Sequence, residues 1–126
     1  MKFTAIRENH LYSKAYSKGK RAVTPALAVY ILPDYAAARL AKAHPEKITV
    51  NRIGLTVSTK LGGAVVRSRV RRILRDGLRA IERRHTLKTG FLIVIAARTL
   101  SVDLKSGDIE SHLDTAFKKL GMYKEI

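Results

Sequence analysis

Eight arginines lie close together between residues 67 and 84, a stretch in which only Asp76 and Glu82 are acidic. A guanidinium is permanently charged and presents parallel N–H donors that match the oxygens of a phosphate group. On a helical wheel at about 100° per residue, the segment separates into an apolar arc and an arginine arc. The arginine arc holds Arg67, Arg69, Arg71, Arg72, Arg75, Arg79 and Arg83. The spacing therefore predicts a helix over 64–84 with one face in the core and the other nearly all guanidinium.

The simplest interpretation of such a face is a solvated helix surface, where charges of both signs are normally mixed. Here no carboxylate precedes Arg67, Arg71 or Arg75 by four residues, and like charges at this spacing cost roughly a few tenths of a kcal/mol. An external polyanion would offset that repulsion. An anionic membrane is disfavoured because the apolar arc is needed for the core. We therefore expect nucleic acid, and RNA rather than DNA because no helix precedes this one by a short turn.

The chain as a whole is strongly basic. Its 126 residues carry 25 Lys and Arg against 10 Asp and Glu, which gives a formal net charge of +15. The apolar fraction of 46% is that of a folded protein rather than a disordered basic tail, and the length suits one domain. The surplus charge therefore lies on a folded surface.

Several classes of protein are excluded by the composition. Without cysteine there is no disulfide framework, no thiolate nucleophile and no Cys-ligated metal. The four histidines are scattered, and no nucleophile–base pair or carboxylate cluster suits catalysis or a metal. The longest apolar runs have seven residues, far fewer than the roughly 20 that span a bilayer, and the N-terminus has no signal peptide. We expect a cytoplasmic protein with no membrane association, no catalytic residues, no metal site of its own and no obligate protein partner.

The remaining patterns predict a single α+β domain over 1–126 with the element order αββαβα. Apolar residues at helical spacing predict a first helix over 7–18. Strands are predicted over 26–32, over 53–57 and over the continuous apolar run 91–97, and a last helix over 107–120. The segment 33–51 is interpreted as a surface insertion between strands, with helical turns over 35–44.

The stretch from Gly54 to Asp76 resembles the signature of a known family. It reads Gly-Leu-Thr-Val-Ser-Thr-Lys-Leu-Gly-Gly-Ala-Val-Val-Arg-Ser-Arg-Val-Arg-Arg-Ile-Leu-Arg-Asp. In the bacterial ribonuclease P protein subunit, a strand ending in Val-Ser is followed by a Lys-x-Gly turn. Ala-Val-x-Arg-Asn-Arg and a Lys/Arg-Arg pair come next. The surrounding elements are also similar in order, except over 33–51.

The resemblance implies an α/β sandwich whose small sheet packs against the arginine helix, with a left-handed βαβ crossover. It also implies that the protein binds ribonuclease P RNA and the 5′ leader of precursor tRNA and aids removal of that leader. The RNA and its Mg²⁺ ions would perform the hydrolysis, so Mg²⁺ is expected through the RNA. Composition alone leaves a ribosomal or assembly protein that binds structured RNA as the alternative.

Two sets of site residues follow from the resemblance. Contacts with the catalytic RNA are expected from Lys60, Arg67, Ser68, Arg69, Arg71, Arg72 and Arg75. Ser68 stands where the family prefers Asn, and it offers one hydroxyl in place of an amide. A leader-binding cleft between the first helix and the sheet is expected from Tyr12, Tyr16, Lys20, Tyr30 and Tyr123. For Tyr12 and Tyr16, packing in the core is the alternative.

Overall fold

A computed structural model of the chain describes residues 3–36, 39 and 51–124. Its centre is a five-stranded sheet with the strand order β1-β4-β5-β3-β2. The strands are β1 (Phe3–Ala5), β2 (Lys20–Val23), β3 (Leu27–Pro33), β4 (Asn51–Thr56) and β5 (Phe91–Ala97). β4 lies parallel to both β1 and β5, whereas β3 is antiparallel to β5 and to β2.

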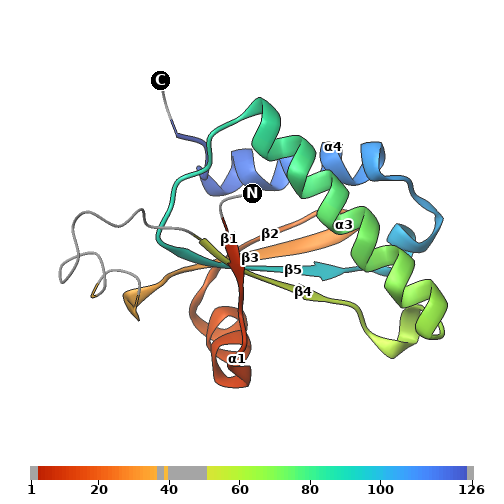
Figure 1. Ribbon diagram of the computed structural model, residues 1–126, viewed down its shortest axis with the longest axis horizontal. Coiled ribbons are helices and arrows are strands. Elements are labelled where there is room, and N and C mark those ends of the chain that lie inside the picture. Colours follow the sequence, from red (N-terminus) through yellow and green to blue (C-terminus); the bar gives the residue numbers. More distant parts are fainter. Residues whose placement is uncertain (1–2, 37–38, 40–50, 125–126) are drawn as a thin grey trace.

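Helices cover both faces of this sheet. α1 (Asn9–Lys18) lies on one face, and α3 (Ala64–Arg84) and α4 (Ser106–Leu120) lie on the other (Figure 1). A short 3₁₀ helix follows each of two parallel strands, η1 (Thr59–Leu61) after β4 and η2 (Thr99–Asp103) after β5. The predicted α+β sandwich and its six elements are confirmed in type and order. Over the described residues, no helix is long and apolar enough to cross a bilayer.

The arginine helix α3 is anchored by the apolar arc that its sequence predicts. Its buried residues are Val70, Ile73, Leu74, Gly77, Leu78 and Ile81. Gly77 permits close packing on α4, because a Cβ there would lie 2.7 Å from Cγ2 of Ile109. Since α3 connects the adjacent parallel strands β4 and β5, the three elements form a βαβ crossover, and the left hand that the resemblance implies stays a prediction.

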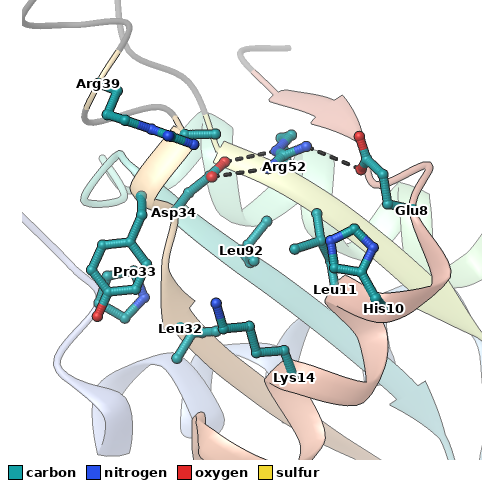
Figure 2. A pocket seen from close by; sticks show the side chains of 12 residues that line it. Glu8, His10, Leu11, Lys14, Leu32, Pro33, Asp34, Arg39, Arg52 and Leu92 are labelled. Atoms are coloured by element: carbon teal, nitrogen blue, oxygen red, sulfur yellow. Dashed lines mark hydrogen bonds and ion pairs between the residues drawn. The ribbon is translucent and has the colours of Figure 1, made fainter.

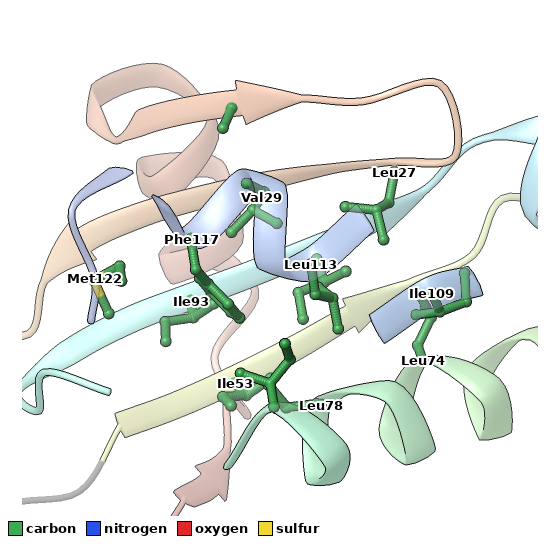
Figure 3. Close-up of a cluster of buried hydrophobic side chains, with 14 of the residues drawn as sticks. Leu27, Val29, Ile53, Leu74, Leu78, Ile93, Ile109, Leu113, Phe117 and Met122 are labelled. Carbon is green, nitrogen blue, oxygen red and sulfur yellow. The ribbon is translucent and has the colours of Figure 1, made fainter. Parts of the chain in front are cut away.

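Alternation along the central strands produces a core on each face of the sheet. Ile53, Ile93 and Ile95 face α3 and α4, where they pack with residues such as Leu113 and Phe117 (Figure 3). Leu32, Leu92 and Val94 face the other way and pack with Ile6 and Ala15 around α1. Because β5 is buried on both faces, its sequence is a continuous apolar run.

The structure has two strands, β1 and β2, that were not predicted. The predicted surface insertion over 33–51 is shorter than expected. Pro33 ends β3 and Asn51 begins β4, while Asp34 is only 3% exposed. These three residues therefore belong to the folded body rather than to a surface excursion. Residues 37–38 and 40–50, where most of the expected helical turns fall, lie outside the described residues.

Candidate nucleic-acid interface

The outward side of α3 carries a row of exposed polar residues. Ser68, Arg72, Arg75 and Arg79 follow one another at i, i+4, i+7 and i+11, so they share one face of the helix. We call these four residues, with Arg83 in the last turn, the arginine face. Among the residues that the structure describes, its one acidic partner is Asp76, whose Oδ1 lies 3.6 Å from Nη1 of Arg79. The face therefore presents largely uncompensated positive charge to solvent.

Arg69 lies outside the arginine face, at the side of α3 that meets α4. Its Nη1 donates to the carbonyl of Val102 at 3.0 Å, and its Nη2 donates to the carbonyl of Leu104 at 2.8 Å. The guanidinium thus connects α3 to the end of η2 and to the residue that follows η2. The helical wheel placed Arg69 on the charged arc because a wheel contains no information about backbone acceptors in another element. The expected RNA contact of Arg69 stays a prediction, with two of its N–H donors already engaged.

Arg67 and Arg71 are half-buried at the opposite margin of α3, so the exposed arginine arc is narrower than predicted. In the described part of the chain, Nε of Arg67 is buried and has no hydrogen-bond partner. Lys60 is exposed on η1, just before α3, and its backbone N–H donates to Oγ of Ser58 at 3.2 Å. Ser68, Arg72, Arg75 and Lys60 are therefore the most accessible of the predicted RNA contacts.

Three of the predicted cleft tyrosines meet on the α1 face of the sheet. The rings of Tyr16 and Tyr30 pack edge to face, with centroids 4.8 Å apart, and the Tyr16 hydroxyl donates to Oγ1 of Thr56 at 2.9 Å. We call Tyr12, Tyr16 and Tyr30 the tyrosine surface. Tyr16 is 40% exposed, so its ring is available to a ligand. Tyr12 and Tyr30 pack on the smaller core, so the core alternative holds in part for Tyr12, and leader binding stays a prediction for all three tyrosines.

Gly54 of β4 lies directly against the Tyr12 ring of the tyrosine surface. A Cβ at position 54 would lie 2.5 Å from the Tyr12 hydroxyl, so only glycine lets the ring approach β4 this closely. Burial, and then the nearby Tyr16, raises the pKa of the Tyr12 hydroxyl above its ordinary value. A glycine inside an alternating strand is a sign of close approach by another group. That sign was present in the sequence.

Lys20 does not share the face of these tyrosines, which corrects its predicted place in the cleft. In the β2–β3 register Lys20 lies opposite Ile31, a residue of the larger core, whereas Arg21 lies opposite Tyr30. Residues directly opposite one another in a sheet project from the same face. Arg21 is therefore the cation beside the tyrosine surface. The sequence pattern missed this because it did not predict β2.

Tyr123 was also wrongly placed, because it lies on the α3–α4 side of the sheet. Its hydroxyl donates to Oδ1 of Asp114 at 2.6 Å, and its ring stacks on His85 with centroids 4.2 Å apart. Backbone hydrogen bonds from Lys88 to Met122 and from Lys124 to Thr86 hold the same segment. Tyr123 thus fastens the end of the described chain to the loop after α3.

Replacing Tyr123 with Phe is expected to lower the free energy of unfolding at neutral pH by about 1 kcal/mol. The hydrogen bond from Tyr123, and then the hydrogen bond and charge of Lys118, lower the pKa of Asp114 below its ordinary 3.8. The resulting stabilisation is present above pH 3.8 and is lost as the pH falls through the lowered pKa. Urea unfolding at neutral pH and well below pH 3.8 should show the difference from wild type shrinking in acid. If the two proteins differed in unfolding free energy by the same amount at both pH values, the hydrogen bond to ionised Asp114 would not be the cause.

A pocket of about 270 Å³ lies at the N-terminal end of α1 (Figure 2). Leu32 and Leu92 form the apolar floor of this pocket. Arg52 of β4 spans it. Its Nε and Nη2 donate to the two carboxylate oxygens of Asp34 at 2.7 and 2.9 Å, and Nη1 donates to Glu8 at 3.2 Å. The hydrogen bond with Asp34 raises the pKa of Arg52. These two ion pairs join the end of β3 to β4 and to the start of α1.

The described part of the chain contains no group of three or more His, Asp or Glu side chains that would hold a metal. The acidic residues near the start of α4 have other partners. Oδ2 of Asp108 accepts from the backbone N–H of Lys105 at 3.0 Å, and Glu110 pairs with Arg84. Asp108 and Glu110 are therefore engaged within the protein and do not fit a protein-held Mg²⁺.

The fold and the two surfaces define a class of protein, a small basic α+β sandwich with an arginine-bearing crossover helix. A family model described as Ribonuclease P matches residues 1–121. The chain is 32% identical to the ribonuclease P protein component of Clostridium botulinum, over 98% of this chain and 99% of that protein. It is 34% identical to that of Clostridium acetobutylicum, over 97% and 92%.

Solved structures agree in fold. The RNase P protein of Staphylococcus aureus superimposes with a TM-score of 0.74 at 22% identity, over 95% of this chain and 97% of that one. The protein from Thermotoga maritima gives 0.67 at 17% identity, over 88% and 92%. The chain belongs to the ribonuclease P protein family. The family is the protein part of a ribonucleoprotein that acts in tRNA processing.

Proposed function

We propose that the protein binds ribonuclease P RNA through the arginine face and the 5′ leader of precursor tRNA through the tyrosine surface. The observation that supports this most directly is the arrangement of the two surfaces around β4. Gly54 and Thr56 contact Tyr12 and Tyr16 on one face, while Ile53 faces the core beneath α3 on the other. The sheet, the larger core and α3 thus lie between two chemically different surfaces on opposite sides of the protein.

The chemistry of each surface suits its proposed ligand. The arginine face offers charge without flat apolar area, which suits the regularly spaced phosphates of folded RNA. The tyrosine surface offers an exposed ring with a cation, Arg21, beside it, which suits the unpaired bases of a single strand. Removal of the leader would then be carried out by the RNA and its Mg²⁺, with the protein positioning both RNAs.

The experiment that tests this function measures cleavage of a precursor tRNA by a bacterial ribonuclease P RNA at low Mg²⁺, with and without the protein. We expect faster cleavage with the protein, because it adds contacts to the catalytic RNA and to the leader. Cleavage no faster than with the RNA alone would contradict the proposal.

Replacing Tyr16 with Ala should weaken binding of leader-bearing precursor by about tenfold and spare mature tRNA. Stacking of a base on an aromatic ring contributes roughly 1–3 kcal/mol, and mature tRNA has no leader to stack. The measurement is the ratio of the two dissociation constants with the assembled ribonucleoprotein.

Tyr16→Phe is the matched control. It keeps the ring and loses only the hydrogen bond to Thr56. It should retain most of the preference for precursor. If Tyr16→Ala weakened both substrates equally, Tyr16 would be a structural residue and not part of a leader site.

A further inference from the structure

A second cavity, of about 330 Å³, opens where the parallel strands β4 and β5 end. The short helices η1 and η2 follow these strands and flank the opening. Crevices beyond the carboxyl ends of parallel strands are frequent ligand sites in α/β proteins. Neither the proposed RNA contacts on α3 nor the tyrosine surface uses this cavity.

The lining of the cavity combines a basic rim with apolar walls. Lys60 and Arg98 supply the charge, Pro25, Leu61 and Leu100 supply the apolar wall, and no carboxylate lines it. Nη1 of Arg98 donates to the carbonyl of Thr24 at 2.9 Å, which holds the guanidinium in place. Leu100 is 44% exposed, although a leucine of a small domain is usually buried.

From this lining we infer that the cavity binds one unpaired nucleotide of the RNA that the arginine face holds. The base would lie against Leu61 and Leu100, and its phosphate would be bound by Lys60 and Arg98. η1, which carries Lys60, is the element just before α3, and Leu61 and Ala97 of the lining pack on the larger core, on the α3 side of the sheet. The cavity therefore lies on the side of the arginine face rather than on that of the tyrosine surface. The inference rests on the proposed function, and it adds Leu61, Arg98 and Leu100 to the residues expected to contact the RNA.

Photocrosslinking tests the site directly. Because the chain has no cysteine, a single introduced cysteine is the only thiol that the crosslinker can label. A benzophenone maleimide would be attached to Thr99→Cys at the cavity, to Ser68→Cys on the arginine face and to Ser111→Cys on the exposed side of α4. Each labelled protein is then assembled with ribonuclease P RNA and precursor tRNA. We expect Thr99→Cys to crosslink unpaired nucleotides of ribonuclease P RNA, and Ser111→Cys to crosslink none.

The other outcomes separate the two proposals. Crosslinks from Thr99→Cys only to precursor tRNA, or only to paired nucleotides, would overturn the inference. Crosslinks from Ser68→Cys alone would also overturn it and would leave the proposed function intact. Failure of all the proteins to bind the RNA would overturn the proposed function and this inference together.

Affinity measurements give a second test, which separates the contribution of the apolar wall at Leu100 from that of the basic rim at Lys60. Leu100→Ala should weaken binding to ribonuclease P RNA by about five- to tenfold without changing the salt dependence, because the variant removes apolar surface and no charge. Leu100→Met keeps an apolar wall and should bind as wild type. Lys60→Gln should lower the slope of log affinity against log salt by about one. Unchanged affinity in Leu100→Ala would overturn the inference.

Discussion

Replacing Arg72, Arg75 and Arg79 together with Gln should weaken binding to ribonuclease P RNA by about 100-fold or more at physiological salt. Each arginine that binds a phosphate contributes roughly 1 kcal/mol or more, and removing each such arginine lowers the salt slope by up to about one. The three side chains are exposed on one side of α3, so the helix itself should remain folded. Filter binding or fluorescence anisotropy across a range of salt concentrations measures both quantities.

The matched control removes the same number of charges elsewhere. Lys88, Lys119 and Lys124 are exposed and lie off the arginine face, so their replacement with Gln gives an equal change in net charge. We expect this control to lose far less affinity and to keep most of the slope. If both triple variants lost affinity equally, the net charge of the chain would explain binding and the arginine face would not.

Replacing Arg52 with Met should lower the free energy of unfolding by about 3 kcal/mol, a large part of the roughly 5–15 kcal/mol of a typical domain. Asp34 is 3% exposed, and the change would remove its bidentate ion pair. The variant loses two charge-assisted hydrogen bonds to a carboxylate that is poorly solvated, and hydrogen bonds to charged groups are among the strong ones. Denaturant unfolding of the two proteins measures the difference.

Two further variants test the cause of that loss. Glu8 is on the solvent side of Arg52 and its side chain is 47% exposed, so Glu8→Gln should cost less than about 1 kcal/mol. Adding Asp34→Asn to Arg52→Met should recover part of the loss, because the buried charge is then gone. A loss in Arg52→Met as small as that in Glu8→Gln would show that this pair contributes little.

Long periodic segments of the sequence were sufficient to predict the elements that carry the arginine face. The boundaries of α3 and β5 agree with prediction, because one has a strong helical period and the other is buried on both faces. β1 and β2 have three and four residues, and β2 buries only Ala22, so neither shows a usable pattern. Without β2 the faces of Lys20 and Arg21 were not predictable.

The other differences between the predicted and the observed positions of site residues arise from tertiary contacts. Tyr123 binds Asp114 and His85, which belong to two other segments, and nothing in its neighbouring sequence indicates that position. Arg69 is held by carbonyl groups 33 and 35 residues further along the chain. Helical spacing brought Tyr12 and Tyr16 together, but only strand register placed Tyr30 beside them.

The tyrosine surface and the arginine face belong to one small domain, and this affects how strongly the leader must be bound. Under the proposed function, a precursor tRNA already held by the catalytic RNA presents its leader to the tyrosine surface within a single assembly. The second interaction is then intramolecular, with an effective local concentration in the millimolar range for a short connection. A leader affinity too weak to detect with the free protein is therefore enough for preference within the assembly. Weak binding of this kind also permits rapid release of the cleaved leader.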